Sequence, residues 1–171
     1  MMRTATAARR AMPAPLNIEI SRNTEGWPEA LDARADEAVR AALAQSKAKV
    51  TGPAELSIVL TNDAEQHVLN RDWRGIDKPT NVLSFPQIEP FAPVSGLLGD
   101  IILARETLVR EAEEQGVSFD DHFTHLVVHG FLHLLGYDHM DEDEALAMEG
   151  LETQILASLG VADPYADDVE T

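Results

Sequence analysis

The sequence predicts an α+β fold in which a small mixed sheet of about four strands is packed with helices. Short apolar or alternating segments are typical of strands, and the longer segments between them carry apolar residues at helical spacing. The elements follow the order strand, helix, strand, helix, strand, strand and three helices. With 171 residues, 44% of them hydrophobic, and no internal repeat, the chain is expected to form one domain with a substantial core.

The first half of the chain alternates strands and helices. Residues 16–21 (LNIEIS) alternate apolar and polar side chains and predict a strand, and residues 55–61 (ELSIVLT) predict a second one. Between these strands, residues 27–46 are rich in alanine and carry apolar residues at helical spacing. Asn62 begins a capping-box pattern, which predicts a helix through about Trp73.

The second half contains a loop, two strands and three helices. Pro79 removes a backbone donor and disfavours helix before it, so residues 75–81 (GIDKPTN) are expected to form a loop. Residues 82–86 (VLSFP) and 97–104 (LLGDIILA) are expected to be strands, and the second is nearly all apolar and therefore central. The three helices are expected over residues 106–115, over residues 119–135 after a Ser118 cap, and from an Asp141 cap to about residue 159.

The domain is expected to span residues 16–160, between two segments of different composition. Residues 1–15 (MMRTATAARRAMPAP) are basic and lack the apolar stretch of a secretory signal, so they predict a disordered extension, with a transit peptide as the alternative. Residues 161–171 form an acidic tail. No apolar run approaches the roughly 18 residues of a membrane span, and we expect a cytoplasmic protein.

Charge is distributed unevenly along the chain. The net charge is −17, and Arg110 is the last lysine or arginine. Nucleic-acid binders usually show the opposite charge bias. The half after Arg110 is either a solvated acidic surface or a docking face for a basic partner protein. If it docks a partner, the expected carboxylates are Glu149, Glu152, Asp167 and Asp168, which helix capping does not explain.

The stretch HGFLHLLGYDH places three histidines, His129, His133 and His139, at metal-ligand spacing. Two histidines four residues apart point the same way from one helix, which is apolar nearly all round and is expected to be buried. Gly136 can end this helix in a left-handed conformation, so that His139 turns back toward the same ion. Three imidazoles leave a fourth position open, which is typical of a catalytic zinc site with one ion per chain.

A competing ligand set consists of His125, His129 and His133. It is weaker, because these residues spread over about 12 Å of helix axis. We therefore expect His125 beside the ligands or in the cleft. The chain contains no cysteine, so any metal must be held by histidine or carboxylate side chains.

Gly130 occupies the position at which zinc proteases of the H-E-x-x-H class carry their glutamate base. The histidine spacing therefore resembles that of a protease, while the residue that takes a proton from the attacking water is missing. This absence counts against peptide hydrolysis.

Three blocks of sequence resemble the YbeY proteins, a family of metal-dependent endoribonucleases and rRNA maturation factors. They are RGIDKPTNVLSFP (residues 74–86), LLGDIIL (residues 97–103) and HGFLHLLGYDH (residues 129–139), and the resemblance extends from about residue 56 to residue 159. It implies an α+β fold with a four-stranded mixed sheet and a zinc site at the mouth of a cleft.

The resemblance also implies a function. The protein would be a zinc-dependent, single-strand-preferring endoribonuclease that acts in small-subunit rRNA 3′ end maturation and ribosome quality control. Its partners would be rRNA and, through the acidic half, small-subunit ribosomal proteins or an assembly GTPase. The alternatives are a ribosome-biogenesis binding factor with weak hydrolytic activity and a zinc hydrolase of another substrate class, including a protease.

Phosphodiester cleavage requires positive charge next to the scissile phosphate rather than a carboxylate base. The block at residues 74–86 supplies Arg74 and Lys78 as cations and Asn81 and Ser84 as polar contacts. Arginine can hold a phosphate through two hydrogen bonds, so Arg74 is expected to act in catalysis together with His129.

Two acids are expected to orient the ligands. Asp100 lies in an otherwise apolar strand, where an unpaired carboxylate would be costly. Asp138 precedes His139 and either orients it, accepts a proton or caps the turn.

Overall fold

A computed structural model describes residues 15–165. Residues 1–14 and 166–171, which hold most of the expected extension and the end of the acidic tail, lie outside the described residues. The predicted α+β class and order of elements are confirmed. The elements are β1 (Leu16–Arg22), α2 (Leu31–Gln45), β2 (Val50–Thr61), α3 (Asp63–Arg74), β3 (Val82–Pro86), β4 (Val94–Ala104), α4 (Arg105–Gln115), α5 (Phe119–Leu135) and α6 (Glu142–Ser158).

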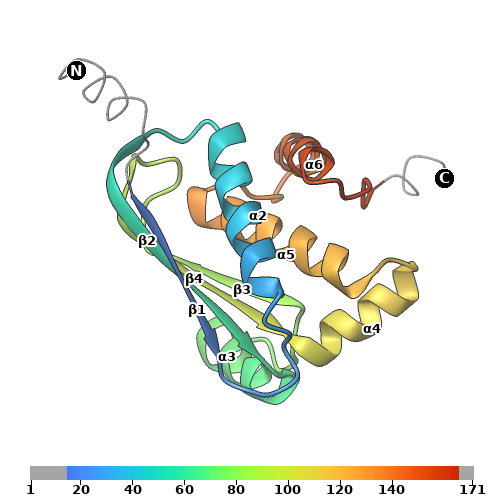
Figure 1. Cartoon of the computed structure of the whole chain (residues 1–171). Helices are drawn as coiled ribbons and strands as arrows, with labels where there is room; N and C mark the ends of the chain where they lie inside the picture. Colours follow the sequence, from blue (N-terminus) through green and yellow to red (C-terminus); the bar gives the residue numbers. More distant parts are fainter. Residues whose placement is uncertain (1–14, 166–171) are drawn as a thin grey trace, which may run out of the picture.

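The four strands form one mixed sheet in the order β1-β2-β4-β3. β1, β2 and β4 run parallel, and β3 pairs with β4 in the antiparallel direction. β4 is an inner strand, as its apolar sequence predicts. Helix α5 packs against β3 and β4 on one side and against α2, α4 and α6 on its others, so it is the centre of the fold (Figure 1).

Three elements begin at other residues than the sequence predicts. β2 begins at Val50 and β4 at Val94, earlier than predicted. The sequence does not reveal these first residues as strand, because they pair irregularly and include Gly and Pro instead of an alternating pattern. Helix α2 begins only at Leu31. The preceding Trp27 is 5% exposed and donates from Nε1 to the carbonyl oxygen of Thr61 at 3.1 Å, so it covers one end of the core instead of opening the helix.

The predicted side-chain caps are confirmed at three helices. Asn62 accepts a hydrogen bond from the backbone N–H of Glu65, and Ser118 accepts one from Asp121. Asp141 caps α6 in the same way. These bonds satisfy backbone donors that a helix leaves free in its first turn.

Gly136 ends α5 and allows a loop to pack closely against it. Its φ is +117°, and a Cβ atom there would lie 2.7 Å from backbone atoms of Pro90 and Phe91. The backbone N–H of Phe91 also donates to the carbonyl oxygen of Leu135 at 2.7 Å. The loop between β3 and β4 is therefore attached to the end of the helix that carries two of the three motif histidines.

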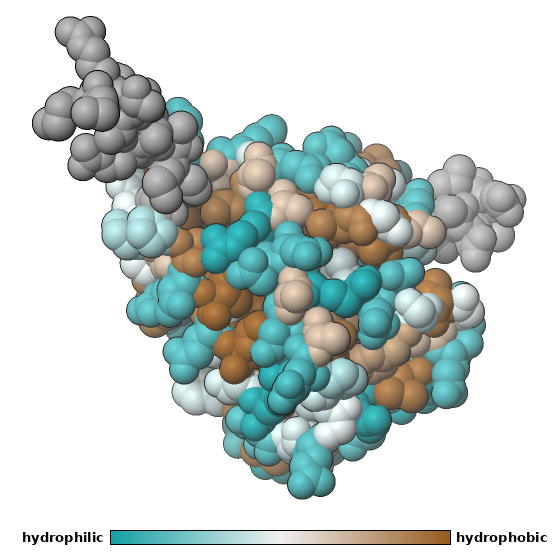
Figure 2. All heavy atoms as spheres, in the orientation of Figure 1, coloured by the Kyte–Doolittle hydropathy of each residue, from teal (hydrophilic) through white to brown (hydrophobic). Residues whose placement is uncertain are grey.

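Within residues 15–165, no helix is both long enough and apolar enough to cross a lipid bilayer. Figure 2 shows hydrophobic residues on the visible face as separate areas among hydrophilic ones, with no single continuous patch.

Gly136→Ala should lower the free energy of unfolding by about 2–4 kcal/mol, because it combines left-handed strain with an overlap against backbone. Urea unfolding measures this change. Gly150→Ala is the control: Gly150 lies in α6 with open space around it, and alanine there should raise stability by about 0.5–1 kcal/mol. Equal effects of the two substitutions would contradict the described packing.

Candidate metal centre and cleft

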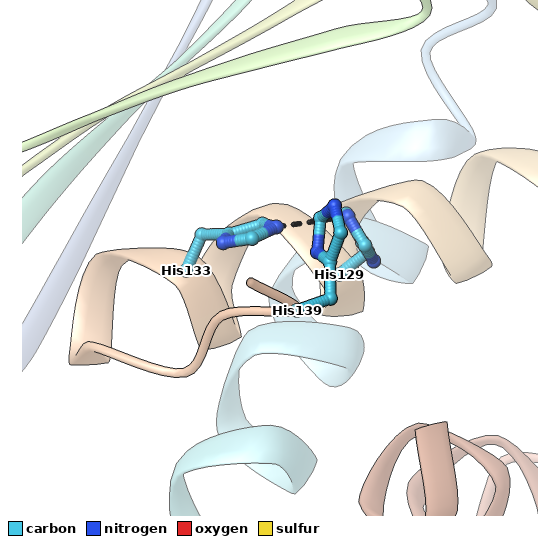
Figure 3. A group of neighbouring side chains, drawn as sticks. All are labelled: His129, His133 and His139. Carbon is cyan, nitrogen blue, oxygen red and sulfur yellow. Dashed lines mark hydrogen bonds between the residues drawn. The ribbon is translucent and has the colours of Figure 1, made fainter. Parts of the chain in front are cut away.

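His129, His133 and His139 lie together at the end of α5 (Figure 3). One ring nitrogen from each lies within 4.8 Å of the others. The Nε2 atoms of His129 and His133 are 3.0 Å apart, and His139 approaches from the turn after the helix. The three imidazoles can therefore share one ion, with the predicted helix-and-turn geometry.

The local environment favours the neutral form of His133. The pKa of His133 is lowered to about 4, mainly by burial and also by the neighbouring His129 and His139. A neutral imidazole has a free lone pair, which is the form that binds a metal. At neutral pH this ligand is therefore ready without losing a proton first.

A buried carboxylate holds His129 from the other side. Glu152 of α6 is 0% exposed, and its Oε1 lies 2.5 Å from His129 Nδ1. An ionised carboxylate only accepts hydrogen bonds, so Nδ1 carries the proton and Nε2 keeps its lone pair. The lone pair is directed toward His133 and the shared centre. Glu152 thus sets both the tautomer and the orientation of His129.

Two further groups donate to Glu152. His125 Nε2 lies 3.2 Å from Oε2, and the hydroxyl of Tyr165 lies 2.5 Å from the same oxygen. Burial alone would raise the pKa of Glu152, but the bonds from His125, His129 and Tyr165 lower it to about 2. The carboxylate is therefore ionised despite its burial. Burial and the charge of Glu152 in turn raise the pKa of Tyr165.

The interpretation of Glu152 as an exposed docking acid is wrong. The positions of the apolar residues around Glu152 indicate its burial, although the acidic composition of this part of the chain does not. Met148, Glu152, Ile155 and Leu156 follow helical spacing, and all four are buried. An acid among the apolar residues of one helix face needs a buried partner, and the histidines of α5 are the nearest candidates.

His125 does not join His129 and His133 in one ligand set. It turns to Glu152, with its ring centroid 6.3 Å from that of His129. His125, His129 and Glu152 form a second group with ligand atoms close together. In this second group, the Glu152 carboxylate oxygens lie 2.5 Å from His129 Nδ1 and 3.2 Å from His125 Nε2, which are hydrogen-bond distances. The two groups meet at His129, which uses Nε2 for one and Nδ1 for the other.

The three histidines open into a cleft of about 730 Å³. Arg74, at the exposed end of α3, lines the same cleft, as do Ser84 and Asp138. Lys78 is not among the lining residues, and its carbonyl oxygen accepts a hydrogen bond from Asn70 at 2.7 Å. Of the two expected cations, Arg74 therefore lies in the same cleft as the histidines and Lys78 does not line it.

The polar groups of β3 and the residue before it are already engaged. Asn81 lines the cleft, but its Nδ2 donates to both carboxylate oxygens of Glu111, at 3.0 and 3.3 Å. Its Oδ1 accepts from the backbone N–H of Val82. Ser84 donates its hydroxyl to the carbonyl oxygen of Gly130 at 3.1 Å. Both side chains hold the walls of the cleft in this arrangement.

Gly130 lies where α5 touches the sheet. A Cβ atom there would lie 2.9 Å from Ile101 Cγ2, 3.1 Å from Ser84 Oγ and 3.3 Å from Val82 Cγ2. A glutamate at this position would have to displace side chains of two strands. Close packing therefore explains why the protease base is absent from an otherwise matching histidine pattern.

The two expected acids have different positions. Ile101, next to Asp100 in β4, faces α5, so Asp100 points to the opposite face of the sheet and away from the histidines. Asp138 is exposed, and its Oδ1 accepts from the backbone N–H of His139 at 2.8 Å. The same oxygen is 3.8 Å from His139 Nδ1, so Asp138 caps the turn and lies beside the ligand.

Three histidines that could hold one metal ion, next to an arginine in one cleft, are an arrangement compatible with a metal-dependent hydrolase. The family model described as "Endoribonuclease YbeY" matches residues 17–160, so the chain belongs to the endoribonuclease YbeY family. Members of this family are metal-dependent hydrolases that cut RNA and act in rRNA processing.

Curated relatives named "Endoribonuclease YbeY" support this membership. The one from Sphingopyxis alaskensis is 58% identical, over 82% of this chain and 92% of its own length. The one from Allorhizobium ampelinum is 52% identical, over 90% of this chain and 97% of its own. The solution structure of TM1509 from Thermotoga maritima has the same fold, with a TM-score of 0.54 and 24% identity over 83% of this chain and 91% of that one.

Glu152→Gln should weaken binding of a metal ion by the three histidines, tested with Zn²⁺, about 10- to 100-fold, because the amide carries no charge to hold His129 in its metal-binding orientation. Competition with a chelator measures the dissociation constant, and the visible spectrum of the Co²⁺ protein reports the ligand geometry separately. Glu144→Gln, an exposed acid of the same helix, should leave both unchanged. Unaltered zinc affinity in Glu152→Gln with an intact fold would show that Glu152 is only a packing residue.

Proposed function

We propose that this protein is a zinc-dependent endoribonuclease that prefers single-stranded RNA. It acts in the cytoplasm on small-subunit rRNA 3′ ends and in ribosome quality control. The observation that carries the proposal is the common cleft of Arg74 and the three histidines in a chain of this family. A ligand set and a phosphate-binding cation that face one space are the parts that phosphodiester hydrolysis needs.

The donor set fits one zinc ion per chain. Three neutral imidazoles from His129, His133 and His139, without thiolates, match catalytic zinc sites with one open position. Glu152 keeps the donor nitrogen of His129 directed to the centre. When bound, zinc supplies a Lewis acid and a positive charge beside the phosphate.

Arg74 is the group that positions the phosphate. Arg74 is exposed at the end of α3 and lines the same cleft as His129 and His133. Two parallel N–H bonds can hold a phosphate in a fixed orientation and balance charge that develops during cleavage. Lys78 belongs to the same loop region and adds positive charge outside the cleft lining.

The alternative of peptide hydrolysis is weakened by the packing at Gly130, which leaves no space for a glutamate base. The alternative of a ribosome-biogenesis binding factor rests on the acidic half of the chain. It is compatible with catalysis, because docking and cleavage use different surfaces.

The acidic half also supports a partner. Glu142, Asp143 and Glu144 are exposed in the first turn of α6, close in sequence to His139. Acids at a helix N-terminus stabilise the helix dipole, and they also present a negative surface. We propose that this surface docks basic small-subunit ribosomal proteins or an assembly GTPase, while the cleft receives rRNA.

Arg74→Ala should reduce RNA cleavage more than tenfold and leave the zinc content unchanged, because the arginine contacts the phosphate and not the metal. Arg74→Lys should recover little activity, since it loses the two-pronged contact. Arg71→Ala, which removes an exposed arginine of the same helix that pairs with Asp72, is the control and should cost less than twofold. Gel-based cleavage of a single-stranded RNA, with elemental analysis, measures both properties. Full activity in Arg74→Ala would contradict the proposal.

Neutralising Glu142, Asp143, Asp167 and Asp168 with Asn or Gln should weaken association with small ribosomal subunits and make it less sensitive to salt. The design leaves out Glu152, which holds His129, and Asp141, which caps α6. Co-sedimentation at two salt concentrations measures the association, and zinc content and unfolding serve as controls. Unaltered binding at both salt concentrations would leave the acidic half as a solvated surface only.

A further inference from the structure

An aromatic pair lies at the edge of the cleft. The rings of Phe91 and Tyr137 are 5.0 Å apart between centroids and meet edge to face at 81°. Tyr137 lines the cleft and directly precedes Asp138 and the ligand His139. Phe91 is 61% exposed, so a large part of this residue is open to solvent next to Tyr137.

Phe91 is held in this exposed position by its backbone. It is the one residue other than glycine with a positive φ among those described, at +60°. A bulky residue in the left-handed region costs free energy and persists only where its surroundings impose it. Its N–H donates to Leu135, and Gly136 gives the loop room to approach the helix. The surrounding loop therefore holds the backbone of Phe91 in a strained conformation, although the largely exposed side chain of Phe91 adds little to the core.

Tyr137 is fixed from two sides. Its ring packs among the partly buried residues of the core, and its hydroxyl accepts a hydrogen bond from the backbone N–H of Lys47 at 3.3 Å. The pair is therefore a rigid surface. A rigid aromatic surface loses little conformational entropy when a ligand ring stacks on it.

The cleft that Tyr137 lines is apolar in part. The lining contains the apolar residues Ile88, Pro90, Leu134 and Met140 as well as the polar residues Arg74, Thr80, Asn81 and Ser84. A nucleotide has the matching two parts, a flat base and a charged phosphate. The three histidines and Tyr137 line the same cleft, and Tyr137 is two residues before His139, so a phosphate at the histidines would place an adjacent base within reach of the aromatic pair.

We propose that Phe91 and Tyr137 form a stacking subsite for an unpaired nucleobase next to the scissile phosphate. The inference rests on the proposed RNA cleavage and names the part of the cleft that selects single strands. A base within a duplex is covered by its neighbours on both faces, so only an unpaired base can stack on Phe91. The subsite accepts any base, because every base offers a flat face.

Trp73 is the other candidate for a stacking residue, since it is 74% exposed and precedes Arg74. Neither Trp73 nor Phe91 is itself among the residues that line the cleft, but Phe91 packs on Tyr137, which does line it, whereas Trp73 has no aromatic neighbour among residues 15–165. It therefore provides the matched control, an exposed aromatic residue outside the proposed subsite.

The test uses the zinc-loaded protein and a short single-stranded RNA made resistant to cleavage by 2′-O-methyl and phosphorothioate groups. One strand carries 2-aminopurine, whose fluorescence is quenched by stacking, and a matched strand is abasic. Phe91→Leu keeps an apolar side chain and removes the ring. It should weaken binding of the strand with bases by about 5- to 150-fold and abolish the quenching. Phe91→Trp should retain both.

The abasic strand separates stacking from phosphate binding. Phe91→Leu should change its affinity less than twofold, and Trp73→Ala should change the affinity of either strand less than twofold. Equal losses for both strands, no loss in Phe91→Leu, or an equal loss in Trp73→Ala would overturn the subsite. If the wild-type protein cleaves unmodified RNA and Phe91→Leu binds the strand with bases as tightly as the wild type, the stacking subsite is wrong and the proposed RNA cleavage stands. If the wild type neither binds nor cleaves RNA, the proposed function fails with it.

Discussion

The hydrogen bond between His129 Nδ1 and the buried Glu152 carboxylate is the interaction on which the site depends. It joins α5 to α6, fixes the tautomer of one ligand and leaves that ligand's other nitrogen free for a metal. Glu152 tolerates burial because His125 and Tyr165 also donate to it. An acid with no exposed surface is thus retained in the core because three donors compensate for its lost hydration.

The close approach of α5 to the rest of the molecule shapes the cleft. At Gly130 the helix touches β3 and β4, and at Gly136 it touches the loop that carries Phe91. These two contacts help to place the histidines in the same cleft as Arg74. They also leave no space for a side chain at position 130, so the packing that forms the cleft excludes the glutamate base of a peptidase.

Local signals in the sequence predicted much of this arrangement. The caps at Asn62, Ser118 and Asp141 act within four residues, and the histidine spacing depends only on helix geometry and one turn. Glu152 is 23 residues from His129, and their contact depends on how α6 crosses α5. The orientation of Asp100 depends on which face of β4 meets the helix. The engagement of Asn81 with Glu111 depends on the position of α4. The helical spacing around Glu152 indicates that it is buried, but no local pattern shows which residue of another element each of these side chains meets.

A crystal structure of the zinc-loaded protein, with an anomalous difference map at the zinc edge, tests the central claim most directly. One peak is expected, about 2.0–2.1 Å from Nε2 of His129, from a ring nitrogen of His133 and from a ring nitrogen of His139. The carboxylate of Glu152 should remain on Nδ1 of His129, outside the coordination sphere. A peak between His125, Nδ1 of His129 and Glu152 would contradict the account, because the carboxylate would then be a ligand.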